Sequence, residues 1–212
     1  MLKVWGRKTS SNVQAVMWCI AELELPYERY DIGHKYGGND TPEFLAMNPN
    51  GLVPVLRDNN GPALFEAGAI LRYLANRYAE GPFWPQALEA RTLVDMWAEW
   101  VKVSVISTFT KPIFWPLIRQ SDAERDTAAL AVATDNLTRL LKIAEARLSQ
   151  HHWLVGDDFT LADVQLGSLL YRYYSLDFKR AELPALRRYY DRLTQRSAYQ
   201  QHVMVSFDEL KS

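Results

Sequence analysis

The spacing of apolar and polar residues divides the chain into two parts with different predicted structure. In residues 1–80, short β-type runs alternate with helical segments. Residues 3–7 predict a strand, apolar positions recur at helical spacing between Val13 and Ile20, and residues 27–32 again have strand composition. After residue 86 the spacing is helical throughout.

The later segments of the first part predict a hairpin between two helices. Thr41 is suited to cap a short helix that has Pro42 at its first position. The sequences VPVLR and PALFE flank the turn residues 58–61, which predict a hairpin, and a helix is expected at 67–79. In order, this part reads βαβ, a connecting helix and ββα, a mixed sheet with helices around one core.

Residues 81–86 contain two prolines and a glycine and predict a linker between a domain at 1–80 and a domain at 87–212. Ser121 and Glu124 have the spacing of a capping box at the start of the second helix of this later domain. The helices are expected near residues 87–110, 122–149, 161–175, 184–194 and 197–203.

Composition excludes several classes of function. The 212 residues carry a formal net charge of −1, so there is no basic excess for binding nucleic acid. Cys19 is the only cysteine, which excludes an internal disulfide, a C-x-x-C pair and a cysteine zinc site. The N-terminus lacks the apolar run of a secretory signal, and Lys111, Pro112 and Pro116 interrupt the apolar region at 103–118. We expect a cytoplasmic protein that does not associate with membranes.

Three separated segments resemble the soluble glutathione transferases of the bacterial and theta-like kind. They are SSNVQAVMWCIAELELPYE (10–28), NPNGLVPVL (48–56) with FEAGAILRYLA (65–75), and GDDFTLADV (156–164). The resemblance implies an α/β thioredoxin-like N-terminal domain and an all-α C-terminal domain. It further implies glutathione as co-substrate, no metal, and a homodimer.

Pro54 stands inside an otherwise apolar strand-like run. Because proline cannot donate to a sheet ladder, it fits a strand start, a bulge or an edge. The resemblance implies that the Val53–Pro54 bond is cis and that the backbone of Val53 binds the cysteinyl part of glutathione, as a peptide adds to a sheet edge. A trans Pro54 on an edge strand is the alternative.

Ser10, Ser11 and Asn12 precede the first helix, where backbone N–H groups and the helix dipole favour negative charge. A free thiol has a pKa of about 8.5, and lowering it by about two units requires about 2.7 kcal/mol of preference for the thiolate. The resemblance assigns thiol activation to Ser10, with Asn12 as a second candidate and Ser11 as a binding residue. A helix N-cap alone is the alternative for Ser11 or Asn12.

The resemblance also indicates where the two ends of glutathione bind. Glu66 would bind the γ-glutamyl ammonium, and the next residue, normally serine or threonine in the family, is Ala67. Leu52 stands where many theta-like members carry a lysine for the glycyl carboxylate, and Lys35 or His34 is a possible substitute. As alternatives, Glu66 is a solvated acid at a helix N-terminus, and the two loop residues are surface positions.

Thr160 and Asp163 predict a capping box with a role in folding. Trp97, Trp100 and Ser104 lie close to one helical stripe and suit a pocket for an apolar second substrate, although tryptophans at this spacing are also typical of a core. The sequence predicts a glutathione-dependent transferase acting on a small apolar electrophile, with possible reduction of a peroxide or a disulfide. The alternative is a non-catalytic module of the same fold that binds ligands or proteins.

Overall fold

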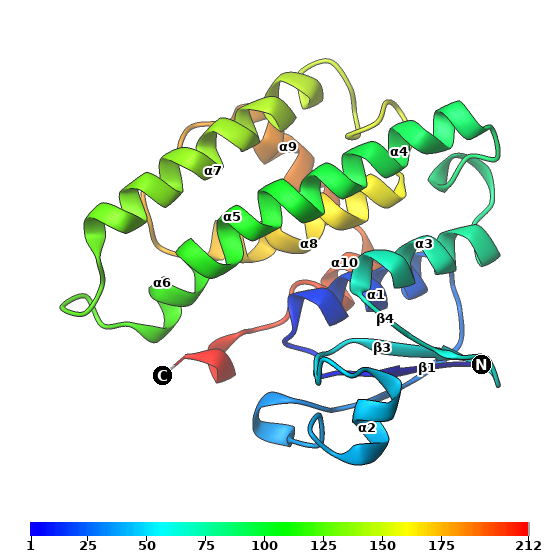
Figure 1. The fold of residues 1–212 in the computed structure, drawn as a ribbon. Coiled ribbons are helices and arrows are strands. Elements are labelled where there is room, and N and C mark those ends of the chain that lie inside the picture. The colour runs from blue at the N-terminus through cyan, green and yellow to red at the C-terminus, as the bar shows by residue number, and fades with distance from the viewer. Residues whose placement is uncertain (212) are drawn as a thin grey trace. The chain divides into compact units, whose positions relative to one another are not determined.

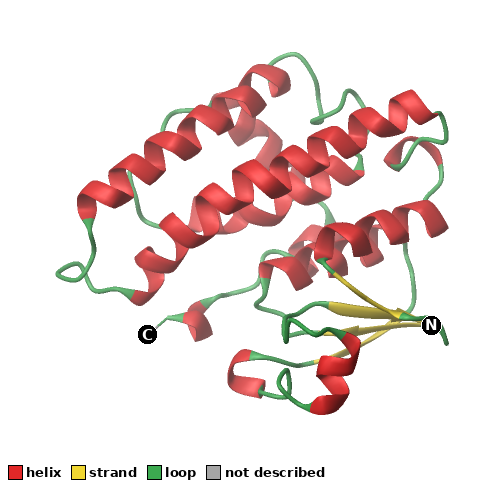
Figure 2. Ribbon diagram, viewed as in Figure 1, coloured by secondary structure: helices red, strands yellow, loops and turns green. Residues whose placement is uncertain are grey.

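A computed structural model of the protein describes residues 1–211 and divides into two compact units by its internal contacts. The first unit comprises Met1–Ala79 with Ser197–Val205, and the second comprises Glu80–Arg196 with the residues from Ser206 onward. Figure 1 colours the ribbon from the N-terminus to the C-terminus, and Figure 2 colours it by secondary structure. The local sequence pattern gave no sign that residues 197–205 group with the first unit.

The first unit is built on a four-stranded mixed sheet, as predicted. Its strands are β1 (Leu2–Trp5), β2 (Tyr27–Tyr30), β3 (Val55–Asp58) and β4 (Ala63–Phe65). They lie in the order β2-β1-β3-β4, with β1 parallel to β2 and antiparallel to β3. The expected turn joins β3 to β4, because the Gly61 N–H donates to the Asp58 carbonyl at 2.8 Å.

Helices α1 and α3 lie on one side of this sheet and α2 on the other (Figure 1). The unit contains α1 (Ser11–Glu22), α2 (Pro42–Met47), α3 (Ala67–Tyr78) and α10 (Ser197–His202), with a 3-10 turn at His34–Tyr36. Thr41 caps α2 as expected, accepting a hydrogen bond from the Phe44 N–H. Helix α10 packs on α1 through the rings of Trp18 and Tyr199, whose centroids are 4.7 Å apart.

The second unit is helical, which confirms the expected fold class. Its main helices are α4 (Leu88–Trp100), α5 (Ser107–Phe109), α6 (Trp115–Arg119), α7 (Thr127–Leu148), α8 (Leu161–Ser175) and α9 (Pro184–Leu193). Short 3-10 turns lie at Gly81–Phe83 and Asp208–Leu210. Helix α8 is buried along most of its length, so it forms the centre of this unit.

Two helix boundaries differ from those expected. The helix that begins at Leu88 continues past residue 110, because π-helical turns at Val101–Ile106 and Thr110–Phe114 join α4, α5 and α6. Pro112 has no N–H and therefore cannot donate the backbone hydrogen bond of an α-helix. The π-helical turns replace the α-helical pattern with i→i+5 hydrogen bonds around this residue.

Helix α7 begins at Thr127, five residues after the predicted start at 122. Asp126 is its N-cap, and its carboxylate accepts the Ala129 N–H at 2.9 Å. The carboxylate of Glu124 accepts the N–H and hydroxyl of Ser121, which closes a separate turn before the helix.

The capping box at the start of α8 is confirmed. Asp163 is fully buried, and its carboxylate accepts hydrogen bonds from the N–H groups of Thr160 and Leu154 and from the Tyr189 hydroxyl, at 2.8, 2.9 and 3.0 Å. Burial nevertheless raises the pKa of Asp163 to about 6. Within residues 1–211, no helix combines the length and the apolar character that crossing a membrane requires.

Candidate active site

Three loops of the first unit meet closely at Gly6 and Gly33, as the neighbours of a Cβ atom placed at each glycine show. A Cβ at Gly6 would lie 2.5 Å from a methyl carbon of Val13 and 3.1 Å from the Val53 Cβ. A Cβ at Gly33 would lie 3.8 Å from a Val53 methyl and 3.6 Å from the Arg7 guanidinium. The loop after β1, the loop after β2 and the loop before β3 therefore meet around Val53.

Ser10 is the N-cap residue of α1, but its side chain does not cap the helix. The backbone has N-cap geometry, with φ −81° and ψ 122°, and the Ser10 carbonyl accepts the Gln14 N–H at 2.8 Å. The hydroxyl donates to and accepts from none of residues 1–211. The Ser10 hydroxyl is thus available to an anion at the positive end of the helix dipole.

Ser11 and Asn12 occupy the first two positions of α1, and both are partly exposed. The structure therefore brings together the three polar side chains that the sequence singled out at this helix terminus. Cys19 lies further along the same helix and is fully buried. Burial raises the pKa of the Cys19 thiol, which keeps it protonated and unsuited to thiol exchange.

The Val53–Pro54 peptide bond is cis, as the resemblance implied. Neither the N–H nor the C=O of Val53 forms a hydrogen bond within residues 1–211. The loop is held by the buried side chain of Asn48, which donates to the Leu52 carbonyl at 2.7 Å and accepts from the Asn50 N–H at 3.1 Å. This role of Asn48 was not predicted, although its position directly after a short helix is typical of an asparagine that binds nearby backbone groups.

Glu66 lies next to Pro54 across the β3–β4 hairpin, because β-pairing of Val55 with Phe65 places the two residues at the same end. Its φ of +66° is rare for a residue with a side chain, and such positions cluster at functional sites. The carboxylate is exposed, and Ala67 begins α3 with its methyl group buried. Backbone N–H groups of the first turn of α3 therefore lie beside the acid.

Leu52 is 64% exposed and contributes no charge at its position. Lys35 lies in the 3-10 turn after β2, with its ammonium 5.2 Å from the centre of the Tyr36 ring. Arg7 is a cation that the sequence reasoning missed; its guanidinium lies beside Gly33, in the loop next to Val53. Nothing in the local sequence indicated it, because its place depends on the meeting of two distant loops.

The residues predicted to bind a second substrate lie in the second unit. The rings of Trp97 and Trp100 meet edge to face at 5.2 Å, and the Arg147 guanidinium lies 5.8 Å from the Trp97 ring. The Ser104 carbonyl accepts the Thr108 hydroxyl at 2.7 Å, within the π-helical part of the long helix. Trp97 and Trp100 are in ring contact, while Ser104 follows one turn later.

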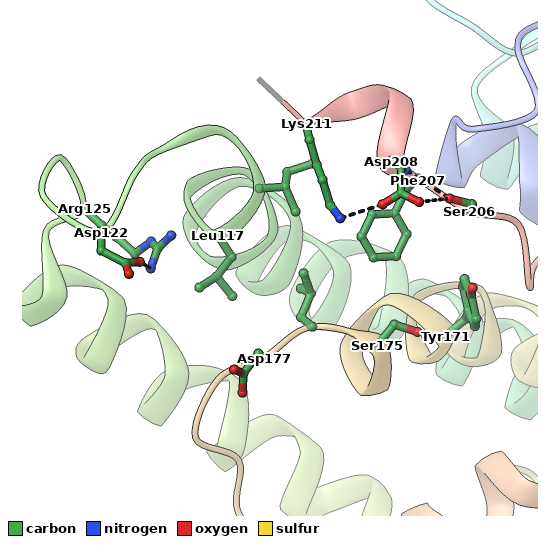
Figure 3. Close-up of a pocket in the computed structure, with 12 residues that line it drawn as sticks. Leu117, Asp122, Arg125, Tyr171, Ser175, Asp177, Ser206, Phe207, Asp208 and Lys211 are labelled. Carbon is green, nitrogen blue, oxygen red and sulfur yellow. Dashed lines mark hydrogen bonds and ion pairs between the residues drawn. The ribbon is translucent and has the colours of Figure 1, made fainter.

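A different part of this unit contains a cavity of about 520 Å³, shown in Figure 3. Its walls come from α6, the end of α8 and the C-terminal segment, and include the ion pairs Arg125–Asp122 and Lys211–Asp208. Trp97, Trp100 and Ser104 do not line it. Among residues 1–211, no three His, Cys, Asp or Glu side chains form a group able to hold a metal ion.

Comparison with known proteins agrees with this geometry. The family model for the glutathione S-transferase N-terminal domain matches residues 1–76, and the model for the C-terminal domain matches residues 94–197. The chain belongs to the glutathione S-transferase family. This transferase is 35% identical over 206 residues to glutathione S-transferase GstB of Escherichia coli, covering 97% of this chain and 99% of that one.

Two further relatives extend the comparison. Glutathione S-transferase 3 of Zea mays is 33% identical over 164 residues, which cover 76% of this transferase and 73% of the maize protein. The crystal structure of a theta-class glutathione S-transferase from Xanthomonas axonopodis pv. citri, with glutathione bound, matches at a TM-score of 0.90 and 41% identity. It covers 97% of this transferase and 98% of that chain. The family and fold implied by the sequence motifs are confirmed, and the non-catalytic alternative receives no support.

Proposed function

We propose that Ser10 activates the thiol of glutathione in this glutathione-dependent transferase. The observation that carries the proposal is the N-cap position of Ser10, whose hydroxyl leaves its own helix uncapped. A donor in that position stabilises a thiolate in the same way as the adjacent N–H groups do. Asn12, two residues further along the chain, supplies a second polar side chain.

The tripeptide is bound by groups on either side of this thiol site. The free N–H and C=O of Val53, followed by the cis Pro54, suit the cysteinyl backbone, as in strand addition. Glu66 binds the γ-glutamyl ammonium, and the Ala67 N–H and Ser11 donate to anionic groups of glutathione. Lys35 and Arg7 are the cations on neighbouring loops that replace the charge Leu52 does not provide.

The proposed reaction then needs two events: the glutathione thiol loses its proton, and the thiolate attacks the second substrate. Glutathione loses its thiol proton to solvent, and the sulfur forms a bond to the electrophilic atom of an apolar second substrate, displacing a leaving group or adding to a double bond. Holding the thiolate beside the electrophile supplies the remaining rate enhancement. When a peroxide is bound, the same thiolate attacks one of its oxygens, the O–O bond breaks and the other oxygen leaves as an alcohol; a second glutathione then displaces water from the resulting sulfenic acid to give glutathione disulfide. When a disulfide is bound, the thiolate attacks one sulfur, the S–S bond breaks and the other sulfur leaves as a thiolate. Trp97, Trp100 and Ser104 remain our proposed contacts for the second substrate.

We also propose a homodimer. Helix α4 exposes large apolar side chains along its length: Leu88 is 64% exposed, Met96 51%, and Val103, just beyond its end, 60%. Such a row suits a contact between two copies of the chain. The cytoplasmic location expected from the sequence stays a prediction.

Turnover measurements test the proposed role of Ser10. Wild type and Ser10→Ala are compared at pH 7 with an aryl halide and with an organic hydroperoxide, each with glutathione. We expect Ser10→Ala to lose about tenfold or more, as removal of one charged hydrogen bond predicts. Ser149→Ala, an exposed serine at the end of α7, is the matched control and keeps full activity. Full activity of Ser10→Ala would overturn the proposal.

A further inference from the structure

The first unit contains a cavity of about 200 Å³ that none of the proposed glutathione-binding residues lines. Its walls come from the loop after β1, from α1, from β2 and from α10 with the residues that follow, and α10 packs directly on α1 (Figure 1). The lining residues are Lys8, Val13, Gln14, Met17, Tyr27, Arg29, Gln201, His202 and Val205. Lys8 is exposed whereas Gln14 and Met17 are buried, so the cavity extends from the surface toward the core.

A buried hydrogen-bond acceptor of Gln14 has no partner in the protein. Gln14 is 2% exposed, and its side-chain nitrogen, Nε2, donates to the Lys8 carbonyl at 3.1 Å. This bond fixes the orientation of the amide, because a carbonyl can only accept. The amide oxygen, Oε1, accepts no hydrogen bond from residues 1–211. A buried polar atom left unpaired is unfavourable, so we expect a donor from outside the chain to supply the missing bond.

A second atom without a partner belongs to His202, which lines the cavity from α10. Its Nε2 atom is buried and forms no hydrogen bond within residues 1–211. The imidazole meets the Tyr27 ring edge to face, with 6.1 Å between the centroids. Burial, and to a smaller extent the charge of Arg29, lowers the pKa of His202, so the ring is neutral at pH 7. His202 therefore adds a hydrogen-bonding atom to the cavity without adding charge.

The charged side chains around the cavity favour an anion. Lys8 and Arg29 line it, and among its described lining residues there is no aspartate or glutamate. The nearby acid is Asp31, which pairs with Arg29 at 2.5 Å. The hydrogen bond from Arg29, and more weakly the N–H and the charge of Lys8, lower the pKa of Asp31. Two positive charges thus stand against one negative charge, and the excess attracts an anion.

The rest of the cavity is apolar and favours a carbon skeleton. The side chains of Val13, Met17 and Val205 and the ring of Tyr27 form this part of the wall. The volume equals the share of roughly seven waters in the liquid, which is more than one bridging water needs. Because apolar walls gain from covering apolar surface, they favour a short organic anion over an inorganic one.

We propose that this cavity binds a small hydroxy carboxylate, a short carbon chain with one carboxylate and one hydroxyl group. The carboxylate lies toward Lys8 and Arg29, and the hydroxyl donates to the Gln14 Oε1 atom. The carbon chain packs on the apolar side chains, and the His202 Nε2 atom bonds to the polar end of the ligand. The site is separate from the glutathione site and does not depend on the proposed role of Ser10.

Nuclear magnetic resonance titration with 3-hydroxybutyrate, with and without saturating glutathione, tests the proposal. We expect saturable shifts of the Gln14 side-chain amide and the His202 ring, with a Kd of about 1 mM, as suits so small a ligand. Glutathione should leave this Kd unchanged. Butyrate lacks the hydroxyl and 1,3-butanediol lacks the charge, so each should bind about tenfold more weakly.

Three results of this titration would overturn the proposal. The first is the absence of a saturable shift, because a water then pairs with Gln14 Oε1. The second is equal affinity for butyrate and 3-hydroxybutyrate. The third is displacement of the probe by glutathione, which would place the probe in the glutathione site.

Variants of the lining residues locate the binding. Val205→Phe fills the cavity without a change of charge and should abolish binding. Gln14→Met removes the acceptor, so 3-hydroxybutyrate should bind no more tightly than butyrate. Lys8→Gln should weaken binding about fivefold. Lys142→Gln, at an exposed lysine on α7, is the matched control and leaves the Kd unchanged.

Undiminished binding in Val205→Phe would overturn the proposal, and so would a retained preference for the hydroxyl in Gln14→Met. If Gln14→Met does not fold, Val205→Phe and the comparison with butyrate decide, because Val205 is partly exposed and its replacement removes no hydrogen bond of the side chain.

Discussion

Replacing Glu66 with glycine should stabilise the protein and weaken glutathione binding at the same time. Glu66 has a φ of +66°, where a side chain is strained and glycine is not. Its side chain is exposed, and its carboxylate forms no hydrogen bond or ion pair within residues 1–211, so the folded protein loses no polar interaction when the side chain is removed. Only the interaction between the Glu66 carboxylate and a bound ligand would be lost.

The two expected effects have opposite signs. A positive φ costs a residue with a side chain about 1–2 kcal/mol. Glycine in turn loses about 0.5–1 kcal/mol through its greater freedom in the unfolded chain. The net gain in the free energy of unfolding is therefore about 0–1.5 kcal/mol. Loss of one exposed charged hydrogen bond to the ammonium weakens binding by about 1.5 kcal/mol, a tenfold rise in Kd.

The assay combines urea unfolding with calorimetric titration of glutathione. Glu24→Gly is the matched control, because Glu24 is also an exposed glutamate with a positive φ, +53°, at the opposite end of α1. It should gain similar stability with an unchanged Kd. Glu66→Gln keeps the backbone strain and should weaken binding without stabilising the fold. An unchanged Kd in Glu66→Gly, or a loss of stability, would show that Glu66 is not held in a strained conformation for glutathione binding.

Three further predictions concern the rest of the molecule. Ala67→Ser restores a hydroxyl at the start of α3 and should tighten glutathione about tenfold by calorimetry; an unchanged Kd would show that the backbone N–H suffices. Asp163→Ala leaves the N–H groups of Leu154 and Thr160 without an acceptor and should lower the free energy of unfolding by about 3–5 kcal/mol, measured in urea. Asp31 has a lowered pKa in the folded protein, so its contribution is present above the unfolded pKa of about 3.9 and is lost as pH falls through the folded value. Asp31→Asn should therefore flatten the pH dependence of stability below about pH 4, and an unaltered profile would contradict this.

Local sequence signals were sufficient for much of the fold. The cap at Thr41, the turn at residues 58–61 and the capping box of Thr160 with Asp163 each depend on residues close together in the chain. Their chemistry acts within one turn, so spacing alone predicts them. The two-part organisation followed from the change in hydrophobic period.

Features that depend on distant contacts were not predicted. The contact of Tyr199 with Trp18 joins residues far apart in the sequence, and no local pattern encodes it. The first helix of the second unit was expected to end near residue 110, but π-helical turns at Val101–Ile106 and Thr110–Phe114 continue it past Pro112. Of the site, the sequence indicated Ser10, while the position of Arg7 beside Gly33 depends on two distant loops and was not predicted. The roles assigned to the site residues stay predictions.

The most direct test of the account is a pH titration of glutathione bound to wild type and to Ser10→Ala, followed by the ultraviolet absorbance of the thiolate. If Ser10 activates the thiol, the pKa of the bound thiol in wild type lies well below the free value of about 8.5, and it rises by about one to two units in Ser10→Ala. A bound thiol with the same pKa as free glutathione, or one unaffected by removal of the Ser10 hydroxyl, would contradict it.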